Sequence, residues 1–171
     1  GLPIGGVDPD LKPFTQSEFT VGIERELSRT YILSARFTRK NVEDAVEDQA
    51  NLGAFESESY IIGNPGKGFA FQQRQAAGYV RQAEAQRLYR GVEVIFTKRL
   101  SNNYYYSANY TYSRLEGNYS GLANSDENGR TAPGVTRTFD YINNGFTAIG
   151  TPDNGILETD RPHYFKAYGG Y

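Results

Sequence analysis

The sequence predicts an all-β fold of about five antiparallel, up-and-down strands. Three observations lead to this prediction: stretches of alternating polar and apolar side chains, tight turns that join these stretches in pairs, and two long connections without alternation. Successive side chains of a strand point to opposite faces, so a period of two indicates strands with one apolar and one polar face. The predicted strands cover about residues 17–26, 30–40, 88–99, 104–115 and 163–171.

The clearest alternation occupies residues 91–113, which we predict to form a β-hairpin. In its second half, one face carries Tyr104, Tyr106, Ala108, Tyr110 and Tyr112. In its first half, Val92, Val94 and Phe96 share a face, and Ile95 interrupts the opposite, polar face. The segment Ser101-Asn102-Asn103 is predicted to be the turn, because Asn tolerates positive φ and caps its own backbone.

An earlier hairpin repeats this design. Residues 17–26 place Phe19, Val21 and Ile23 on one face, and residues 30–40 place Tyr31, Leu33, Ala35 and Phe37 on one face. Leu27-Ser28-Arg29 is the short connection between them, and Ile32 interrupts the polar face. Both hairpins therefore predict sheets with two chemically different faces.

The connections alternate between short and long, which bears on the solvent of the two faces. The long ones cover about residues 41–86 and 116–162, and a short helix is expected near residues 75–88. Such long connections are uncommon in compact soluble domains. Outer-membrane barrels combine short periplasmic turns with long extracellular loops, and strands of about 10 residues match a tilted membrane span. The pattern thus favours part of a transmembrane β-barrel over a soluble sheet.

The composition limits the classes of function. The 171 residues carry a net charge of −2, which gives no indication of nucleic-acid binding. Cys is absent, so disulfides, zinc-thiolate sites and Cys nucleophiles are excluded for this sequence. The hydrophobic share is 38% and the aromatic share 14%, a combination that suits a barrel better than a dry aliphatic core. The chain lacks an initial Met and a signal peptide, so we expect a piece of a longer protein.

Candidate motifs for catalysis, cofactors or metals are all incomplete, and we therefore predict no enzyme, no cofactor and no metal site. Residues 64–68 resemble a phosphate loop but lack its Ser or Thr. Residues 124–135 resemble half of a calcium loop but end in Val135, where Glu is required. The acidic residues near 43–48 are interpreted as a hydrated surface. The lone His163 supports no catalytic set and is expected at the start of a strand.

Four stretches, taken in order, carry a family resemblance. They are residues 10–13 with 17–27, residues 89–93 through 98–102, residues 110–119, and residues 160–163 with Phe165 and Lys166. Together they resemble strands of TonB-dependent outer-membrane receptors, and more narrowly the Oar-like group, whose members carry a carboxypeptidase-regulatory-like N-terminal domain.

The resemblance implies a barrel of about 22 strands around a plug, located in the bacterial outer membrane. The implied partners are outer-membrane lipid, the rest of the barrel and the plug, and a TonB-type energy-coupling complex. No plug and no TonB box is recognisable in this sequence, so the resemblance places energy coupling in parent regions absent here. The implied function of the parent is import of a bulky ligand, whose identity the sequence does not reveal.

The barrel interpretation assigns the apolar face to lipid and the polar face to the lumen. The predicted lipid-facing aromatic belt consists of Tyr31, Phe37, Tyr104, Tyr106, Tyr110 and Tyr112. Ser28 and Asn102 are expected on the periplasmic side, and the long connections outside. The alternative is a soluble β-sandwich carbohydrate-binding module, in which exposed Tyr rings stack on sugars.

Overall fold

The computed structural model describes residues 6–50, 60–76, 78, 83–121, 139, 146–148, 151–152 and 154–171. The chain divides into two compact units. The strand unit comprises Glu18–Asn41, Leu88–Leu115 and Thr159–Tyr171, and the loop unit comprises Gly1–Ser17, Val42–Arg87 and Glu116–Glu158. Across the described residues, no helix is long and apolar enough to cross a membrane.

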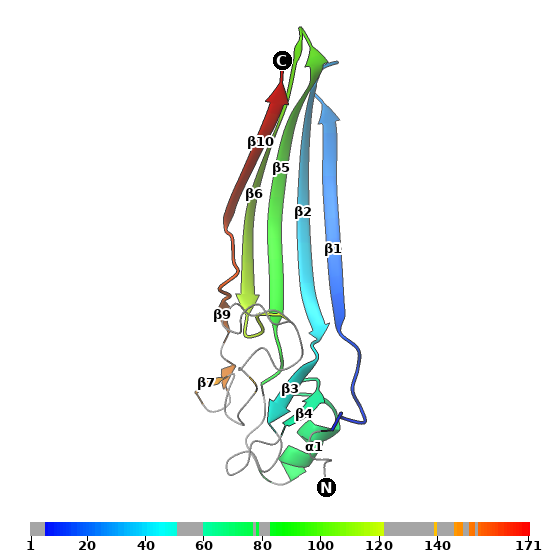
Figure 1. Ribbon diagram of the computed structural model, residues 1–171, viewed down its shortest axis with the longest axis vertical. Coiled ribbons are helices and arrows are strands. Elements are labelled where there is room, and N and C mark those ends of the chain that lie inside the picture. The colour runs from blue at the N-terminus through cyan, green and yellow to red at the C-terminus, as the bar shows by residue number, and fades with distance from the viewer. Residues whose placement is uncertain are drawn as a thin grey trace. The chain divides into compact units, whose positions relative to one another are not determined.

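Five long strands carry the strand unit and form an antiparallel meander (Figure 1). They are β1 (Thr15–Glu26), β2 (Tyr31–Asp44), β5 (Arg87–Ser101), β6 (Tyr104–Gly117) and β10 (His163–Gly170). Their order in the sheet, β1-β2-β5-β6-β10, is also their order along the chain. This confirms the predicted all-β, up-and-down class. The sheet is open, with β1 and β10 at its two edges among the described strands.

The register between strands defines two faces, because residues directly opposite each other point to the same side. Strand β2 pairs with β5 from Tyr31 opposite Lys98 to Asn41 opposite Leu88 without a break. Strand β10 pairs with β6 from His163 opposite Tyr112 to Gly170 opposite Tyr105. We call one side the apolar face; it includes Leu33, Ala35, Phe37, Val92, Val94, Phe96, Tyr106, Ala108, Tyr110 and Phe165.

The opposite side is the polar face. It includes Ser34, Arg36, Thr38, Lys40, Glu93, Thr97, Ser107, Asn109 and Lys166. Ile32 and Ile95, the two exceptions in the sequence pattern, lie on this face opposite Thr97 and Ser34. The period of two therefore predicted the faces correctly, including the positions where it is interrupted.

The two tight turns use the residues that their geometry requires. Asn102 and Asn103 have φ angles of 53° and 69°, a left-handed conformation that Asn tolerates better than most residues. In the other turn, the Leu27 N–H donates to the Tyr31 carbonyl at 2.9 Å, and the Ser28 hydroxyl accepts from the backbone of residues 30 and 31. The Ser28 turn thus satisfies its backbone groups locally.

The loop unit has secondary structure and a core of its own, which the sequence analysis did not predict. It contains β3 (Glu47–Ala50), β4 (Tyr60–Gly63), α1 (Gly68–Ala76), β7 (Phe146–Ala148), β8 (Thr151–Pro152) and β9 (Gly155–Ile156). Its apolar core comprises Val42, Ala45, Ala83, Tyr119 and Phe139. The core joins segments that are distant in the chain, and alternation within any one of them does not reveal it.

The helix lies earlier than the sequence suggested: the expected helix near residues 75–88 is wrong for residues 83–88, and residues 77 and 79–82 lie outside the described residues. Helix α1 ends at Ala76, residues 83–86 are not helical, and β5 begins at Arg87. The Asp8 carboxylate accepts hydrogen bonds from the Phe69 and Ala70 N–H groups at 3.2 and 2.8 Å. Those N–H groups at a helix start need an acceptor. Because the acceptor comes from a distant part of the chain, a local pattern could not locate the helix.

Two buried amides hold the connections of the loop unit together. The Asn64 side chain accepts from the Lys12 N–H at 2.7 Å and donates to the Lys12 and Ala45 carbonyls at 3.0 and 2.7 Å. The Asn118 side chain accepts from the Gln86 N–H at 2.7 Å and donates to the Glu84 carbonyl at 2.9 Å. Both side chains are buried, so these bonds satisfy backbone groups that would otherwise lose water without compensation.

Tyr119 lies fully buried in the core of the loop unit. Burial raises the pKa of its hydroxyl, the Glu47 carboxylate raises this pKa further, and Arg87 lowers it. Among the described residues, the hydroxyl has no hydrogen-bond partner. The ring therefore acts as an apolar core group, and its phenol stays neutral in ordinary buffers.

Candidate functional surfaces of the strand unit

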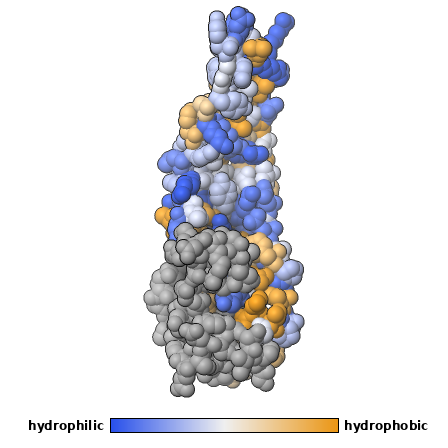
Figure 2. Space-filling view, in the orientation of Figure 1, coloured by the Kyte–Doolittle hydropathy of each residue, from blue (hydrophilic) through white to orange (hydrophobic). Residues whose placement is uncertain are grey.

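The apolar face of the strand unit is exposed among the described residues. Large side chains on it remain well exposed, with Phe19 at 59%, Ile23 at 71% and Phe165 at 65% of their surface accessible. Figure 2 shows hydrophobic and hydrophilic residues together on the surface along the strands. Side chains of this kind are normally buried, and a large contiguous exposed apolar surface marks an interaction site.

One aromatic cluster lies on the apolar face near the tight turns. The rings of Tyr31 and Phe96 stack with centroids 5.7 Å apart, and the centroids of Phe96 and Tyr106 are 6.0 Å apart. The buried Lys98 ammonium lies 3.7 Å from the centroid of the Tyr104 ring and donates to the Ser101 and Tyr104 carbonyls, each at 2.8 Å. We call this group the turn-end aromatic cluster.

A second aromatic cluster lies at the other end of β6, around His163. The Tyr110 hydroxyl and His163 Nδ1 share a hydrogen bond of 2.7 Å. The ring centroids of Tyr110 and Tyr112 lie 6.2 and 5.3 Å from that of His163. Between this far-end aromatic cluster and the turn-end cluster, the face carries Leu33, Ala35, Val92, Val94 and Ala108.

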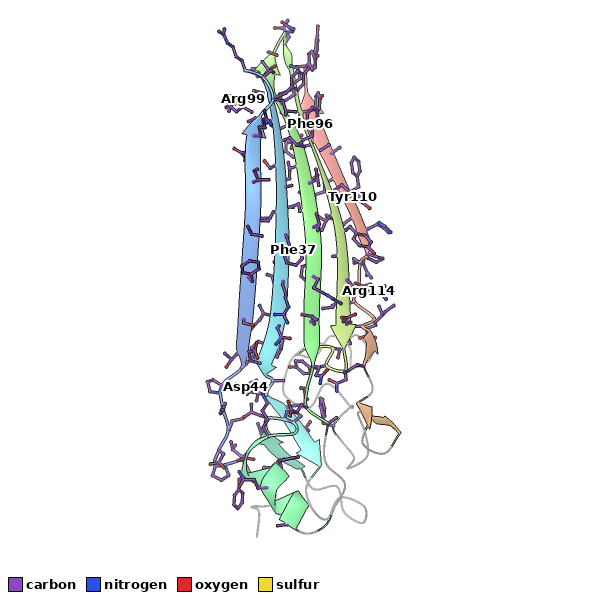
Figure 3. All side chains as sticks on the ribbon, turned by 180° about the vertical axis from the view of Figure 1, so that it is seen from behind. Phe37, Asp44, Phe96, Arg99, Tyr110 and Arg114 are labelled. Atoms are coloured by element: carbon purple, nitrogen blue, oxygen red, sulfur yellow. The ribbon has the colours of Figure 1, made fainter. Side chains whose placement is uncertain are left out.

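All six residues of the predicted belt therefore lie on one face, and five of them fall into two separate clusters. Tyr31, Tyr104 and Tyr106 belong to the turn-end cluster, and Tyr110 and Tyr112 to the far-end cluster. Phe37 lies opposite Val92 on β5. Figure 3 labels Phe37, Phe96 and Tyr110 along the strands. The sequence pattern grouped these residues only by their alternation along each strand. It did not indicate Phe96 and His163 as members of the clusters.

The separation of the two clusters can be compared with a membrane. The eight steps along the strand from Tyr104 to Tyr112 span about 27 Å at about 3.4 Å per residue. A strand tilt of about 40° reduces this span to about 21 Å along the membrane normal, close to the apolar band of about 25 Å in outer-membrane barrels. The two clusters thus have the spacing of the two aromatic girdles that border such a band.

The polar face carries a ladder of side-chain contacts between strands. Near one end, the Lys40 ammonium pairs with the Glu18 carboxylate at 3.1 Å. Further along, Ser34 donates to Glu24 at 2.9 Å. In the middle, Glu93 pairs with Arg36 and accepts from the Asn109 amide at 2.6 Å. The contacts connect four neighbouring strands, so this face is chemically suited to water rather than to lipid.

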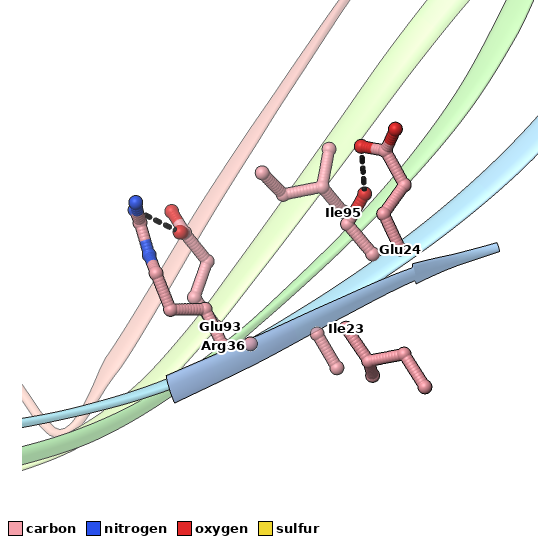
Figure 4. A pocket seen from close by; sticks show the side chains of 8 residues that line it. Ile23, Glu24, Arg36, Glu93 and Ile95 are labelled. Carbon is pink, nitrogen blue, oxygen red and sulfur yellow. Dashed lines mark hydrogen bonds and ion pairs between the residues drawn. The ribbon is translucent and has the colours of Figure 1, made fainter. Parts of the chain in front are cut away.

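A shallow cavity of about 340 Å³ lies on the polar face beside this ladder (Figure 4). Eight residues line it: Gly22, Ile23, Glu24, Ser34, Ala35, Arg36, Glu93 and Ile95. Glu24 and Ser34 are hydrogen-bonded to each other, as are Arg36 and Glu93, whereas Ile23 lies on the other side of β1 from Glu24. The polar groups at this cavity satisfy one another, and we assign no chemistry to it.

The incomplete motifs have the following positions. Residues 64–68 form a turn closed by the Lys67 N–H and the Asn64 carbonyl at 2.9 Å, and the Lys67 ammonium pairs with Asp44 at 3.0 Å. His163 is the first residue of β10. The segment 124–135 lies outside the described residues. Within the described part of the chain, no group of three or more His, Cys, Asp or Glu side chains is arranged to hold a metal ion.

Comparison with known proteins connects these surfaces to a family. The outer membrane beta barrel domain family matches residues 1–171. The chain is also 33% identical over 171 residues to the TonB-dependent transporter Oar of Myxococcus xanthus. That alignment covers 99% of this chain and 14% of the relative, so the chain spans about one seventh of the relative's length. No solved structure matches.

These matches decide between the two interpretations of the sheet. They favour the barrel over the soluble β-sandwich alternative, and they point to a receptor or transporter barrel rather than to an enzyme family. They also confirm the predicted resemblance to Oar-like barrels and the location in the bacterial outer membrane. This chain belongs to the outer membrane β-barrel domain family.

Proposed function

We propose that this chain supplies five neighbouring strands to the barrel wall of a TonB-dependent outer-membrane transporter. The apolar face contacts lipid, and its aromatic belt lies at the two borders of the apolar band. The polar face lines the lumen. The tight turns at Ser28 and Asn102 lie on the periplasmic side, and the long connections lie outside the cell. The family match and the similarity to Oar support this assignment.

The observation that carries the proposal is the contrast between the two faces. The apolar face leaves large side chains such as Ile23 and Phe165 open, although burying each is worth about 1.5–3 kcal/mol. The polar face instead connects its charged groups across the strands, as with Glu93 between Arg36 and Asn109. A bilayer on one side and a hydrated lumen on the other suit both sets of side chains.

The proposal extends to the full-length protein. The similar Oar protein is named a TonB-dependent transporter, and most of its length lies beyond the part aligned here. We propose that such further regions supply the rest of the barrel, the plug and the contact with a TonB-type energy-coupling complex. The full-length protein then imports a bulky ligand, and the long connections contribute to capturing it.

The assignment of the faces can be tested with neighbouring residues on β6. Ala108 lies on the apolar face opposite Ala167, and Asn109 lies on the polar face opposite Lys166. Each is replaced in turn by Cys in the full-length protein, labelled with a nitroxide and examined in lipid vesicles. We expect the label at Ala108 to collide mainly with dissolved oxygen, which concentrates in lipid. The label at Asn109 should collide mainly with a water-soluble nickel chelate.

Equal access of nickel to both labels would refute the lipid assignment of the apolar face. The orientation has a separate test on intact cells. Cys introduced at Asp126 in the full-length protein should react with a membrane-impermeant maleimide, whereas Cys at Asn102 should react only after the outer membrane is permeabilised. Reaction at Asn102 alone would reverse the proposed orientation and leave the lipid contact unaffected.

A further inference from the structure

The chain just before β1 is part of the fold of the loop unit. It runs parallel to β4 and extends the β3–β4 sheet by one bridge at Ile62. The Asp8 N–H donates to the Ile62 carbonyl at 2.8 Å, and the Ile62 N–H donates to the Gly6 carbonyl at 3.0 Å. Figure 1 shows this segment, in dark blue, beside α1 and β4. We call residues 6–12 the strap.

Asp8 connects the strap to the helix. This residue is only 2% exposed. Its Oδ1 accepts a hydrogen bond from the Phe69 N–H at 3.2 Å, and its Oδ2 accepts one from the Ala70 N–H at 2.8 Å. Helix α1 has no acidic residue in its own first turn. Asp8 therefore supplies, from outside the helix, the acceptors and the negative charge that stabilise a helix start.

The local sequence of the strap orients the Asp8 carboxylate. The Leu11 N–H donates to the Asp8 carbonyl at 3.0 Å and closes a turn in which Pro9 holds the second position. Proline presets the φ angle that this position requires. The Asp8 Oδ1 also accepts from the Asp10 N–H at 2.8 Å, a short-range contact typical of Asp in turns. The strap thus presents its carboxylate through contacts within a few residues.

Asn64 binds the other end of the strap. Its side-chain amide accepts from the Lys12 N–H at 2.7 Å and donates to the Lys12 carbonyl at 3.0 Å. The same amide donates to the Ala45 carbonyl at 2.7 Å, and Asn64 is only 3% exposed. The strap is therefore held at three places, by β4, by α1 and by Asn64. All three belong to the connection between β2 and β5.

We propose that the strap is a conformational switch: α1 and the β3–β4 sheet are folded only while residues 6–12 are docked on them. Undocking would remove the acceptors of the Phe69 and Ala70 N–H groups and the backbone partners of Ile62. Buried backbone groups that lose their partners destabilise a fold. A helix of nine residues and a two-stranded sheet are also marginal on their own in water. The strap therefore decides whether this connection is ordered.

The switch gives the chain that leads into β1 control over the long connection between β2 and β5. Only Pro13 and Phe14 separate the strap from β1. In the proposed transporter, displacement of the strap would release α1 and change the surface that the connection offers to the ligand. This consequence rests on the proposed function, whereas the switch itself does not depend on which face of the sheet contacts lipid.

The test measures hydrogen exchange in the full-length protein in lipid vesicles and compares Asp8→Ala with Asp10→Ala. Asp10 is exposed and lies two residues away, so its variant is the matched control. We expect Asp8→Ala to speed exchange about tenfold or more across α1. Exchange should become faster by a similar factor at the Lys12 amide, whose partner is Asn64 rather than Asp8. Asp10→Ala should leave exchange at both places unchanged.

Coupling between the two ends of the strap must be reciprocal. Asn64→Ala should therefore speed exchange across α1, although the Asn64 side chain bonds to Lys12 and Ala45. A change confined to α1 in Asp8→Ala would mean that Asp8 only caps the helix, and it would overturn the switch. If Asp8→Ala does not fold, Asp8→Asn keeps an acceptor oxygen and should show a smaller increase at both places.

A disulfide provides the complementary test. Val7 and Ile62 are bridge partners on neighbouring segments, within the range of a disulfide, and this chain contains no Cys. Val7→Cys with Ile62→Cys is added to the Asp8→Ala variant. Oxidation should hold the strap in place and slow exchange across α1 relative to the reduced form. Equal exchange in the oxidised and reduced forms would contradict control of α1 by the strap.

Failure of this inference is distinguishable from failure of the proposed function. If the nitroxide at Ala108 is in lipid while Asp8→Ala leaves exchange at Lys12 unchanged, the barrel assignment stands and the switch is wrong. If the nitroxide at Ala108 is in water while the strap variants behave as expected, the switch stands and only its role in a transporter is lost.

Discussion

The strand unit and the loop unit of this chain are stabilised in different ways. Every residue of β1 is exposed, and the apolar face leaves its large side chains open. The loop unit instead buries Ile61, Tyr119 and Phe139 completely. Among the described residues, the loop unit thus has a core of its own, whereas the strand unit leaves its large apolar side chains exposed. The proposed contact of the apolar face with lipid predicts this difference.

Their polar contacts differ in the same sense. In the strand unit, the contacts on the polar face join exposed or half-exposed side chains, as in the pair of Arg36 and Glu93. In the loop unit, buried side chains bond to backbone groups, as Asp8, Asn64 and Asn118 do. Removing a buried partner leaves a desolvated group behind, whereas an exposed partner is replaced by water. Replacing a buried side chain that bonds to the backbone of the loop unit should therefore lower the free energy of unfolding more than replacing a side chain on the polar face.

The largest effect is expected at Gly117 of the loop unit. Its φ of 148° disfavours any other residue, and a Cβ would lie 1.9 Å from the Gln86 carbonyl oxygen. We expect Gly117→Ala to lower the free energy of unfolding by about 3–5 kcal/mol, from backbone strain and overpacking together. Gly155, its direct partner on β9, has open space around it, so Gly155→Ala is the matched control. Urea titration of the full-length protein in vesicles measures both.

The second effect tests the two faces of the strand unit. Ala108→Arg places a charge on the proposed lipid-facing side between the two aromatic clusters, and it should cost about 2–4 kcal/mol of folding free energy in vesicles. Asn109→Arg places the same charge on the polar face and should cost much less. An equal loss of folding free energy in the two variants would remove the distinction between the faces.

Tyr106→Leu is a further check on the same face. Lipid accepts Leu readily, whereas a packed core would lose the volume of the ring. A loss of folding free energy as large as that of Ala108→Arg would therefore contradict lipid exposure of Tyr106.

The third effect concerns the buried side chain of Asn64, which bonds to the backbone of Lys12 and Ala45. Asn64→Ala leaves the Lys12 N–H and the Ala45 carbonyl without their partner in a buried position. We expect a loss of about 1–3 kcal/mol in the free energy of unfolding. Hydrogen exchange should also become faster at the Lys12 amide. If the Lys12 amide keeps its protection from hydrogen exchange, the Asn64 side chain does not order the segment before β1.

The smallest effect is expected for the ion pair on the polar face. Arg36 and Glu93 are 57% and 21% exposed, so water screens their attraction. A double-mutant cycle with Arg36→Gln and Glu93→Gln should yield a coupling free energy of about 0.2–1 kcal/mol. A coupling well above this range would mean that the lumen beside this pair excludes water, and the polar face would then resemble the interior of the loop unit.

Much of the strand unit could be predicted because its signals are local. Alternation depends only on neighbouring residues, and it identified both faces of β2 and β5, including the exceptions Ile32 and Ile95. The conformation of Asn102 and Asn103 follows from the tolerance of Asn for positive φ. The six belt residues were placed on one face for the same reason. The grouping of five of them into two clusters required the register between strands, which brought Phe96 and His163 into contact with them.

The loop unit could not be predicted, because its contacts join residues that are far apart in the chain. Asp8 meets the start of α1 across about 60 residues, and Asn118 meets Gln86 across about 30. The sequence by itself therefore determined the strands, the turns and the chemistry of each face, since each depends on a few neighbouring residues. The tertiary structure alone decided the position of α1, the backbone contacts of Asn64 and Asn118, and the two aromatic clusters, because pairing between distant segments creates them.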